Sequence, residues 1–225
     1  FLDNRAFQLI IAVKLAQLIG ISAATGGLIF FFARVIDVPL TILPVFGLAT
    51  TVAVFVSTPV LLWVGRHLGK KVGYALSAGI TGLAALSWMF AQPGDPTWMV
   101  LLRGFFLGIA FAGNVMFAMS MLTDAMEVDW HRTGMRREGM YSALYSFVEK
   151  LAMSIGPLIL GGALSVAGFD PSSPPSEVTP GVRQAVLLGI AYVPAAMAVV
   201  AVAILSFYRL DQRALEASRA VRVER

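Results

Sequence analysis

The sequence predicts an all-α integral membrane protein with six transmembrane helices, from its composition and from the length of its apolar runs. Of the 225 residues, 58% are hydrophobic and only 13% are charged, and the mean hydropathy is +0.79. Soluble domains carry about 25% charged residues. The apolar residues occur in runs of about 20, the length of helix that crosses a bilayer. These observations exclude a soluble globular enzyme, a disordered chain and a nucleic-acid-binding domain.

The apolar runs are expected to be helices. Helices and closed barrels are the structures that satisfy their own backbone hydrogen bonds inside lipid, and the sequence lacks the alternating ten-residue segments of a barrel. The predicted spans are 6–33, 41–64, 72–91, 97–122, 141–168 and 184–208. Together they form a bundle over 1–208, followed by a charged cytoplasmic tail over 209–225.

Polar breaks separate these spans. The segment 37–39 ends the first span, which contains Lys14 and is too long for a signal peptide. The charged run 66–71 precedes the third span, and the Pro- and Gly-rich turn 92–96 precedes the fourth. The polar stretch 123–140 precedes the fifth span, and the Pro- and Ser-rich loop 170–180 precedes the sixth.

The distribution of basic residues predicts the orientation. Of the 17 Lys and Arg residues, twelve lie on one side of the predicted spans and three, Arg34, Arg103 and Arg183, lie on the other. Cytoplasmic loops collect Lys and Arg, so both chain termini are expected in the cytoplasm. The net charge of +4 therefore points to no nucleic-acid partner.

Catalytic and metal chemistry are not expected. The chain has no Cys and two His, neither of them within a span, so no metal site or haem is predicted. Glu149 is the one acid well inside a span, which argues against a nucleophile–base set or paired catalytic acids.

The segment from Asp124 to Lys150 carries the most specific motif. An acidic stretch is followed by Gly134-Met-Arg136-Arg137-Glu138-Gly139, and Lys150 lies twelve residues after Glu138. This pattern resembles the loop between the tenth and eleventh helices of the glycoside–pentoside–hexuronide:cation symporters, a branch of the major facilitator superfamily. Two weaker segments are similar to the same family: the start at 4–7, where Ala6 replaces the usual Pro, and the run 63–71.

The resemblance implies helices seven to twelve of a twelve-helix transporter, that is, the C-terminal six-helix half, and the opening Phe1 fits a fragment. It implies sugar:cation symport by alternating access in a bacterial inner membrane. The solute would bind between this half and an N-terminal six-helix half. No cofactor is implied; the coupling Na⁺ or H⁺ would bind mainly in the other half. Alternatives are a same-fold carrier of lysolipid or another solute, and a transport-inactive scaffold.

Six residues are candidates for the solute cavity. A Lys near the bilayer centre costs about 2.5–3.5 kcal/mol, so Lys150 is expected to face a watery cavity or an acid. Ser142, Ser146 and Ser154 recur at steps of four with Lys150 and form a polar stripe on its helix. The full set is Lys150, Tyr145, Ser146, Asn114, Gln17 and Lys14. The alternatives are snorkelling for the two lysines, helix-to-helix hydrogen bonding for Asn114, and structural pairing for Lys150 and Glu149.

Mixed charges before the fifth span suggest a cytoplasmic gate. The candidates are Asp124, Arg132, Arg136, Arg137 and Glu138. Exposed ion pairs are weak singly, yet a network of them can bias an equilibrium between two conformations. The alternative is an ordinary solvated loop.

Overall fold

A computed structural model describes residues 4–170 and 178–210. In that part of the chain, six helices are long and apolar enough to span a membrane, as the sequence predicts. The elements are α1 (Arg5–Phe30) continued by η1 (Phe31–Val35), α2 (Ile42–His67), α3 (Lys70–Ser87) with η2 (Trp88–Phe90), α4 (Thr97–Thr133), α5 (Glu138–Val166), and α6 (Pro180–Leu187) continued through η3 (Leu188–Tyr192) into α7 (Val193–Ser206). The predicted tail beyond residue 210 and much of the 170–180 loop lie outside the described residues.

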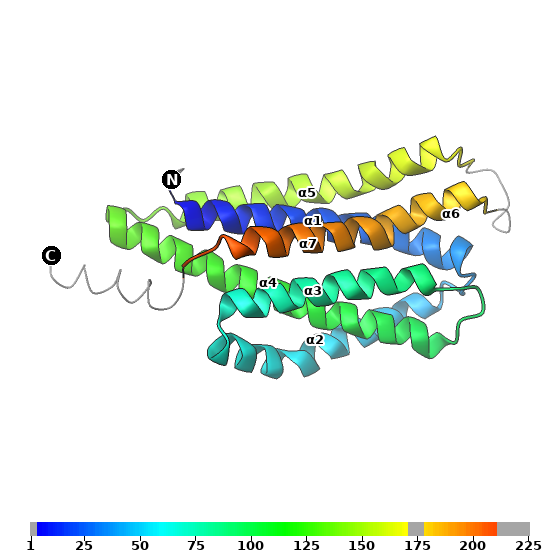
Figure 1. The fold of residues 1–225 in the computed structure, drawn as a ribbon, viewed down its shortest axis with the longest axis horizontal. Helices are drawn as coiled ribbons and strands as arrows, with labels where there is room; N and C mark the ends of the chain where they lie inside the picture. The colour runs from blue at the N-terminus through cyan, green and yellow to red at the C-terminus, as the bar shows by residue number, and fades with distance from the viewer. Residues whose placement is uncertain (1–3, 171–177, 211–225) are drawn as a thin grey trace.

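The helices form two groups that meet along α3, α7 and α1 (Figure 1). α1 packs against α5 and α7, α4 packs against α2 and α3, and α3 packs against α7. α2 and α5 therefore lie at opposite edges of the bundle. α1 begins and α7 ends at the same end of the bundle, here called the N-terminal end.

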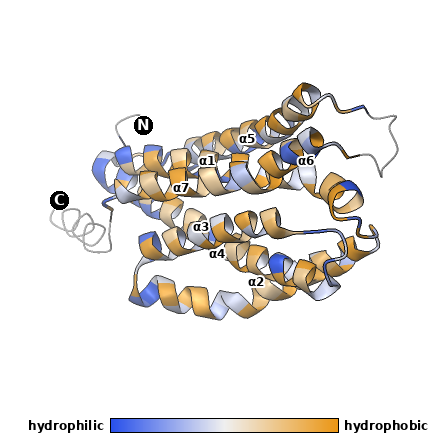
Figure 2. Cartoon of the chain, turned by 45° about the vertical axis from the view of Figure 1, so that its right-hand side comes forward, coloured by the Kyte–Doolittle hydropathy of each residue, from blue (hydrophilic) through white to orange (hydrophobic). Residues whose placement is uncertain are grey.

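Most residues along the helices are apolar, and polar residues gather toward the helix ends (Figure 2). Phe55 and Leu158 on the edge helices are 74% and 73% exposed. Apolar side chains of this size remain exposed at such levels when lipid is the surrounding medium.

α4 continues for eleven residues past the predicted span end at 122 and takes up much of the polar stretch 123–140. Its 37 residues make a helix about 55 Å long at 1.5 Å per residue, well beyond the roughly 30 Å hydrocarbon core. Glu127 and His131, four residues apart, pair along this extension at 3.4 Å. Gly134 ends the helix with φ 70°, a left-handed conformation that favours glycine.

α1 and α5 approach closely near their middles. A β-carbon on Gly156 would collide with the backbone of Ser22 and Ala23, so only glycine fits there. The Ser22 hydroxyl donates a hydrogen bond to the Met153 carbonyl at 2.8 Å. This contact fixes the register in which α1 and α5 present their side chains to each other.

Candidate functional site

A charged cluster lies between α1 and α5. The Lys14 Nζ is 3.5 Å from Glu149 Oε2, and it lies over the Tyr145 ring at 4.2 Å from the centroid. Tyr145 and Glu149 are one turn apart on α5 and so share the face that meets α1. The Lys14 side chain is 11% exposed and that of Glu149 is 48% exposed, so the pair opens onto the surface of the bundle.

Lys150 and Ser146 lie beside this cluster but not in it. Both are exposed, and Lys150 is rotated about 100° from Glu149 on the helix. One side of α5, which we call the polar flank, is made up of Ser142, Ser146, Glu149, Lys150 and Ser154, and all five are exposed. The exposed apolar residues Phe147, Leu151 and Leu158 adjoin this flank, and exposed Met153 lies among its polar residues.

Gln17 and Asn114 lie in the interior of the bundle. The Tyr74 hydroxyl donates to Gln17 Oε1 at 2.6 Å, which joins α3 to α1. Asn114 Nδ2 donates to Thr81 Oγ1 at 2.8 Å, which joins α4 to α3. Asn114 Oδ1 is buried and has no hydrogen-bond partner among the described residues. The structure thus brings together Lys14 and Tyr145 with Glu149, whereas the two amides hydrogen-bond to side chains of α3.

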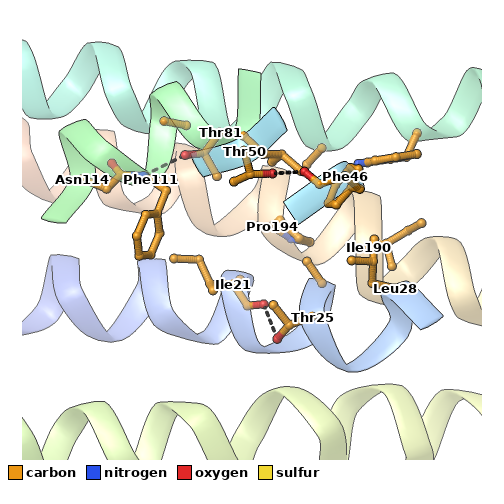
Figure 3. Close-up of a pocket in the computed structure, with 16 residues that line it drawn as sticks. Ile21, Thr25, Leu28, Phe46, Thr50, Thr81, Phe111, Asn114, Ile190 and Pro194 are labelled. Carbon is orange, nitrogen blue, oxygen red and sulfur yellow. Dashed lines mark hydrogen bonds between the residues drawn. The ribbon is translucent and has the colours of Figure 1, made fainter. Parts of the chain in front are cut away.

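Asn114 lines a cavity of about 190 Å³ whose walls include residues of α1 and α4 (Figure 3). Most of its wall is apolar, including Ile21, Phe111 and Pro194. The Thr25 and Thr50 hydroxyls in the wall donate to carbonyls of their own helices. The cavity is therefore suited to an apolar group, and the charged cluster is not part of its lining.

The two lysines at the start of α3 organise the N-terminal end. Lys70 Nζ lies 2.6 Å from Asp124 Oδ2 on α4. Lys71 Nζ donates to the carbonyls of Ser206 and Tyr208 at 2.9 and 2.8 Å, where the final helix ends. Burial raises the pKa of Tyr208, and the negative charge of Asp124 raises it further. The sequence motif contains both lysines, but sequence reasoning did not identify them as partners of these groups.

Asn4 connects three helices at the same end. Its Oδ1 accepts from the Phe7 backbone N–H and caps α1. Its Nδ2 donates to the Ala125 carbonyl on α4 at 3.0 Å and to the Tyr141 hydroxyl on α5 at 3.4 Å. Sequence reasoning used Asn4 only as part of the resemblance, although an Asn at the start of a helix is a recognisable cap signal.

The remaining predicted gate residues surround the turn between α4 and α5. Arg136 places its guanidinium 5.5 Å from the centroid of the Trp130 ring. Arg137 donates to the Met135 sulfur at 3.4 Å, and Arg132 and Glu138 are exposed. Of the predicted gate charges, Asp124 is the one with an ion pair that joins two helices in the described structure.

Comparisons with known proteins show similarity of this chain to transporters. A family model described as MFS/sugar transport protein matches residues 1–212. The glucuronide carrier protein homolog of Escherichia coli (strain K12) is 27% identical over 215 residues, which are 93% of this chain and 45% of that protein. The uncharacterized symporter YnaJ of Bacillus subtilis (strain 168) is 28% identical over 171 residues, 75% of this chain and 35% of that protein.

A third relative is the putative 2,3-dihydroxypropane-1-sulfonate exporter of Escherichia coli (strain K12). It is 27% identical over 150 residues, 66% of this chain and 31% of that protein. The chain spans between about a third and just under half the length of these three curated relatives.

Proposed function

This chain belongs to the MFS/sugar transport protein family, as its resemblance to the glycoside–pentoside–hexuronide:cation symporters predicted, and from that membership we propose that it forms one half of a symporter for an anionic sugar. It is an integral membrane protein of a transporter family and not an enzyme. The family implies a small-molecule solute.

The polar flank of α5 is the observation that carries the proposal. Glu149 and Lys150 lie about 17 Å along α5 from Glu138 at 1.5 Å per residue, deep within the hydrophobic length. Charged groups at that depth face water or another protein surface, because lipid cannot solvate them. Lipid can cover the side with Phe147 and Leu158, so the polar flank is the side that faces the solute path.

The chemistry of the flank suits a polyhydroxylated anion. Lys14 and Lys150 offer ammonium groups, Ser146 offers a hydroxyl, and Tyr145 offers an aromatic ring. Two of the relatives are named for anionic solutes that carry hydroxyl groups, a glucuronide and 2,3-dihydroxypropane-1-sulfonate. Asn114 and Gln17 complete the proposed site as groups that position α1 and α4 through α3.

We place a second, N-terminal six-helix half over the polar flank, with the solute between the two halves. Transport then proceeds by alternating access, coupled to Na⁺ or H⁺. Both chain ends lie in the cytoplasm of this arrangement, in a bacterial plasma membrane. The common location of the start of α1 and the end of α7 supports a shared side, and the bias of Lys and Arg supports the cytoplasmic one.

The N-terminal end of the bundle would act as the cytoplasmic gate. The Lys70–Asp124 pair holds α3 to α4, and Asn4 holds the start of α1 to α4 and α5. The end of α4, the turn after it and the start of α5 offer the other half four charged residues, Arg132, Arg136, Arg137 and Glu138.

Uptake of radiolabelled methyl β-D-glucuronide by cells that express the complete transporter tests this function. Lys150→Ala should abolish accumulation while the protein still inserts in the membrane, and Lys150→Arg should restore part of it. Arg66→Ala, which removes an exposed cation at the end of α2, is the matched control and should transport normally. Normal accumulation by Lys150→Ala would contradict the proposal.

Lysolipid uptake in place of glucuronide uptake would favour a lipid carrier, and no flux of solute or cation would favour a scaffold.

A further inference from the structure

The cavity that Asn114 lines, here called the apolar cavity, is large enough for one aromatic ring. Its volume is about 190 Å³, and apolar cavities of about 150 Å³ in other proteins bind benzene. Leu28, Phe46 and Ile190 form part of its wall (Figure 3). A six-carbon ring therefore fits here and needs no polar partner.

The polar side chains of the wall already donate hydrogen bonds within the protein. The hydroxyls of Thr25 and Thr50 donate to carbonyls of their own helices, and the Thr81 hydroxyl donates to the Ser77 carbonyl at 3.0 Å. Asn114 in turn donates to Thr81. A sugar ring, which carries a hydroxyl on most of its carbons, would find few partners here, and burial of an unpaired hydroxyl is unfavourable. The apolar cavity therefore suits a substituent of a sugar better than the sugar itself.

The apolar cavity opens to the surface between α1 and α4. Thr25 on α1 is exposed, Phe111 on α4 is 49% exposed, and both line the cavity. Lys14, Ile21 and Thr25 follow one another on α1 at steps of seven and four residues, so they point within about 40° of one another. The side of α1 that presents Lys14 to the polar flank is therefore the side on which the cavity opens.

The spacing along α1 matches a sugar acid that carries an aryl group. Lys14 and Ile21 are seven residues apart, which is about 10 Å along the helix axis. In an aryl glycoside, the carboxylate of the sugar and the far edge of the ring on the anomeric oxygen are also about 10 Å apart, from bond lengths of about 1.5 Å. A solute held by its carboxylate at Lys14 can therefore reach the apolar cavity with its aglycone, the group on the anomeric oxygen.

We propose that the apolar cavity binds the aglycone of the solute, and that the preferred solute is an aryl glycoside of a sugar acid. This inference rests on the proposed function, because it requires an anionic sugar on the polar flank. The sugar carboxylate lies at the ammonium groups of Lys14 and Lys150, and the aryl ring lies between α1 and α4 against Ile21 and Phe111. Aromatic rings bury a large apolar area and pack well edge to face against other rings. The flank then recognises the sugar acid, and the cavity distinguishes its glycosides by their aglycones.

Equilibrium binding of labelled phenyl and methyl β-D-glucuronide to the purified complete transporter tests this inference. The two compounds share the sugar acid and differ in the aglycone alone. The phenyl compound should bind about 10- to 100-fold more tightly, the range expected when a side chain as large as that of Phe is buried. Uptake of the same two compounds by cells is measured separately, so that binding and transport are distinguished.

Thr25→Trp tests where the aryl ring binds. An indole at the cavity mouth should reduce the affinity for the phenyl compound to that for the methyl compound, and it should leave the affinity for the methyl compound unchanged. Thr51→Trp is the matched control, because Thr51 is an exposed Thr whose hydroxyl donates to the carbonyl four residues before it, as that of Thr25 does. Thr51 does not line the apolar cavity, so this variant should bind both compounds as the wild-type protein does.

Phe111→Ala should have the opposite effect, since it enlarges the apolar cavity. It should weaken binding of the phenyl compound and strengthen binding of naphthyl β-D-glucuronide, whose aglycone is larger. The affinity for the methyl compound reports in each variant whether the protein is folded.

The possible results separate the inference from the proposed function. Equal affinity of the wild-type protein for the phenyl and methyl compounds would overturn the inference, leave the symporter assignment intact and favour a lipid chain as the occupant of the cavity. An equal loss of affinity for both compounds in Thr25→Trp would also overturn it, because position 25 would then contact the sugar. A preference for the phenyl compound without uptake of either glucuronide would support the inference and count against the proposed function.

Discussion

Lys70 lies 2.6 Å from one oxygen of the Asp124 carboxylate and 2.8 Å from the other, so the first residue of α3 is ion-paired with the extension of α4. Both side chains are less than a third exposed. The pair connects α3 to α4 at the end of the bundle where the gate is proposed, so it is an interaction that substitution can remove to test the gate.

The first prediction concerns this pair. Asp124→Asn and Lys70→Met should each change the maximal transport rate by a factor of about five, which corresponds to about 1 kcal/mol, the upper range for exposed pairs. The double variant should be no worse than either single variant, because both remove the same interaction. Initial rates of uptake for the four proteins measure this. Additive effects of the two substitutions would show that the residues act separately.

The second prediction concerns the contact between α1 and α5. Gly156→Ala should destabilise the protein by about 1–3 kcal/mol, because the added carbon meets backbone that cannot move aside easily. Gly161→Ala on the same helix is the control, since open space surrounds that position. Thermal unfolding in detergent compares the two. Equal stability of both variants would mean that the helices do not approach as described.

The third prediction concerns Arg136, whose guanidinium lies over Trp130. Arg136→Gln should change the rate of transport more than the KM, because a gate residue affects the conformational step and not the solute. Trp130→Leu should change the rate in the same direction. Steady-state uptake kinetics provide the measurement, and a raised KM with an unchanged rate would assign Arg136 to solute binding instead.

The fourth prediction concerns Tyr208, whose hydroxyl is buried without a hydrogen-bond partner in the described residues. Tyr208→Phe should be nearly neutral at pH 7, because no hydrogen bond is lost. Burial and the charge of Asp124 raise the pKa of Tyr208, so its phenol ionises at a lower pH in the unfolded chain than in the folded protein. The free energy of unfolding of the wild-type protein should therefore fall as the pH rises above about 10, the ordinary pKa of tyrosine, toward the raised pKa of Tyr208 in the folded protein.

Stability curves of the two proteins from pH 7 to alkaline pH test this difference. The loss that depends on Tyr208 should be missing in the Phe variant. Parallel curves for both proteins would indicate that the phenol does not titrate differently on unfolding.

The sequence predicted the six membrane helices because long apolar runs have few alternative structures in lipid. The motif from Asp124 to Lys150 predicted the family. The extension of α4 was not expected, because the stretch after residue 122 is polar and a helix outside the membrane needs no apolar pattern. Glu127 and His131, spaced four residues apart, and Gly134 at the helix end are local signals that could have indicated it.

The pairing of Lys14 with Glu149 could not be assigned from the sequence, which left a partner on another helix as one possibility. It depends on the axial register of α1 relative to α5. The close approach of Gly156 to Ser22 and the Ser22–Met153 hydrogen bond fix that register. For the same reason, the sequence grouped Asn114 and Gln17 with Lys150, whereas the structure bonds them to α3. Their roles in transport stay predictions.

Because α4 is one long continuous helix, a small tilt moves its ends by a large distance. A continuous helix of 37 residues, about 55 Å long, tilts as one rod, so a tilt of about 10° displaces one end relative to the other by about 10 Å. The end that projects beyond the bilayer is bonded to α3 through Lys70. A small rotation beside the solute would therefore be amplified at the membrane surface and shared by two helices, and a spectroscopic label on exposed Arg132 would report it.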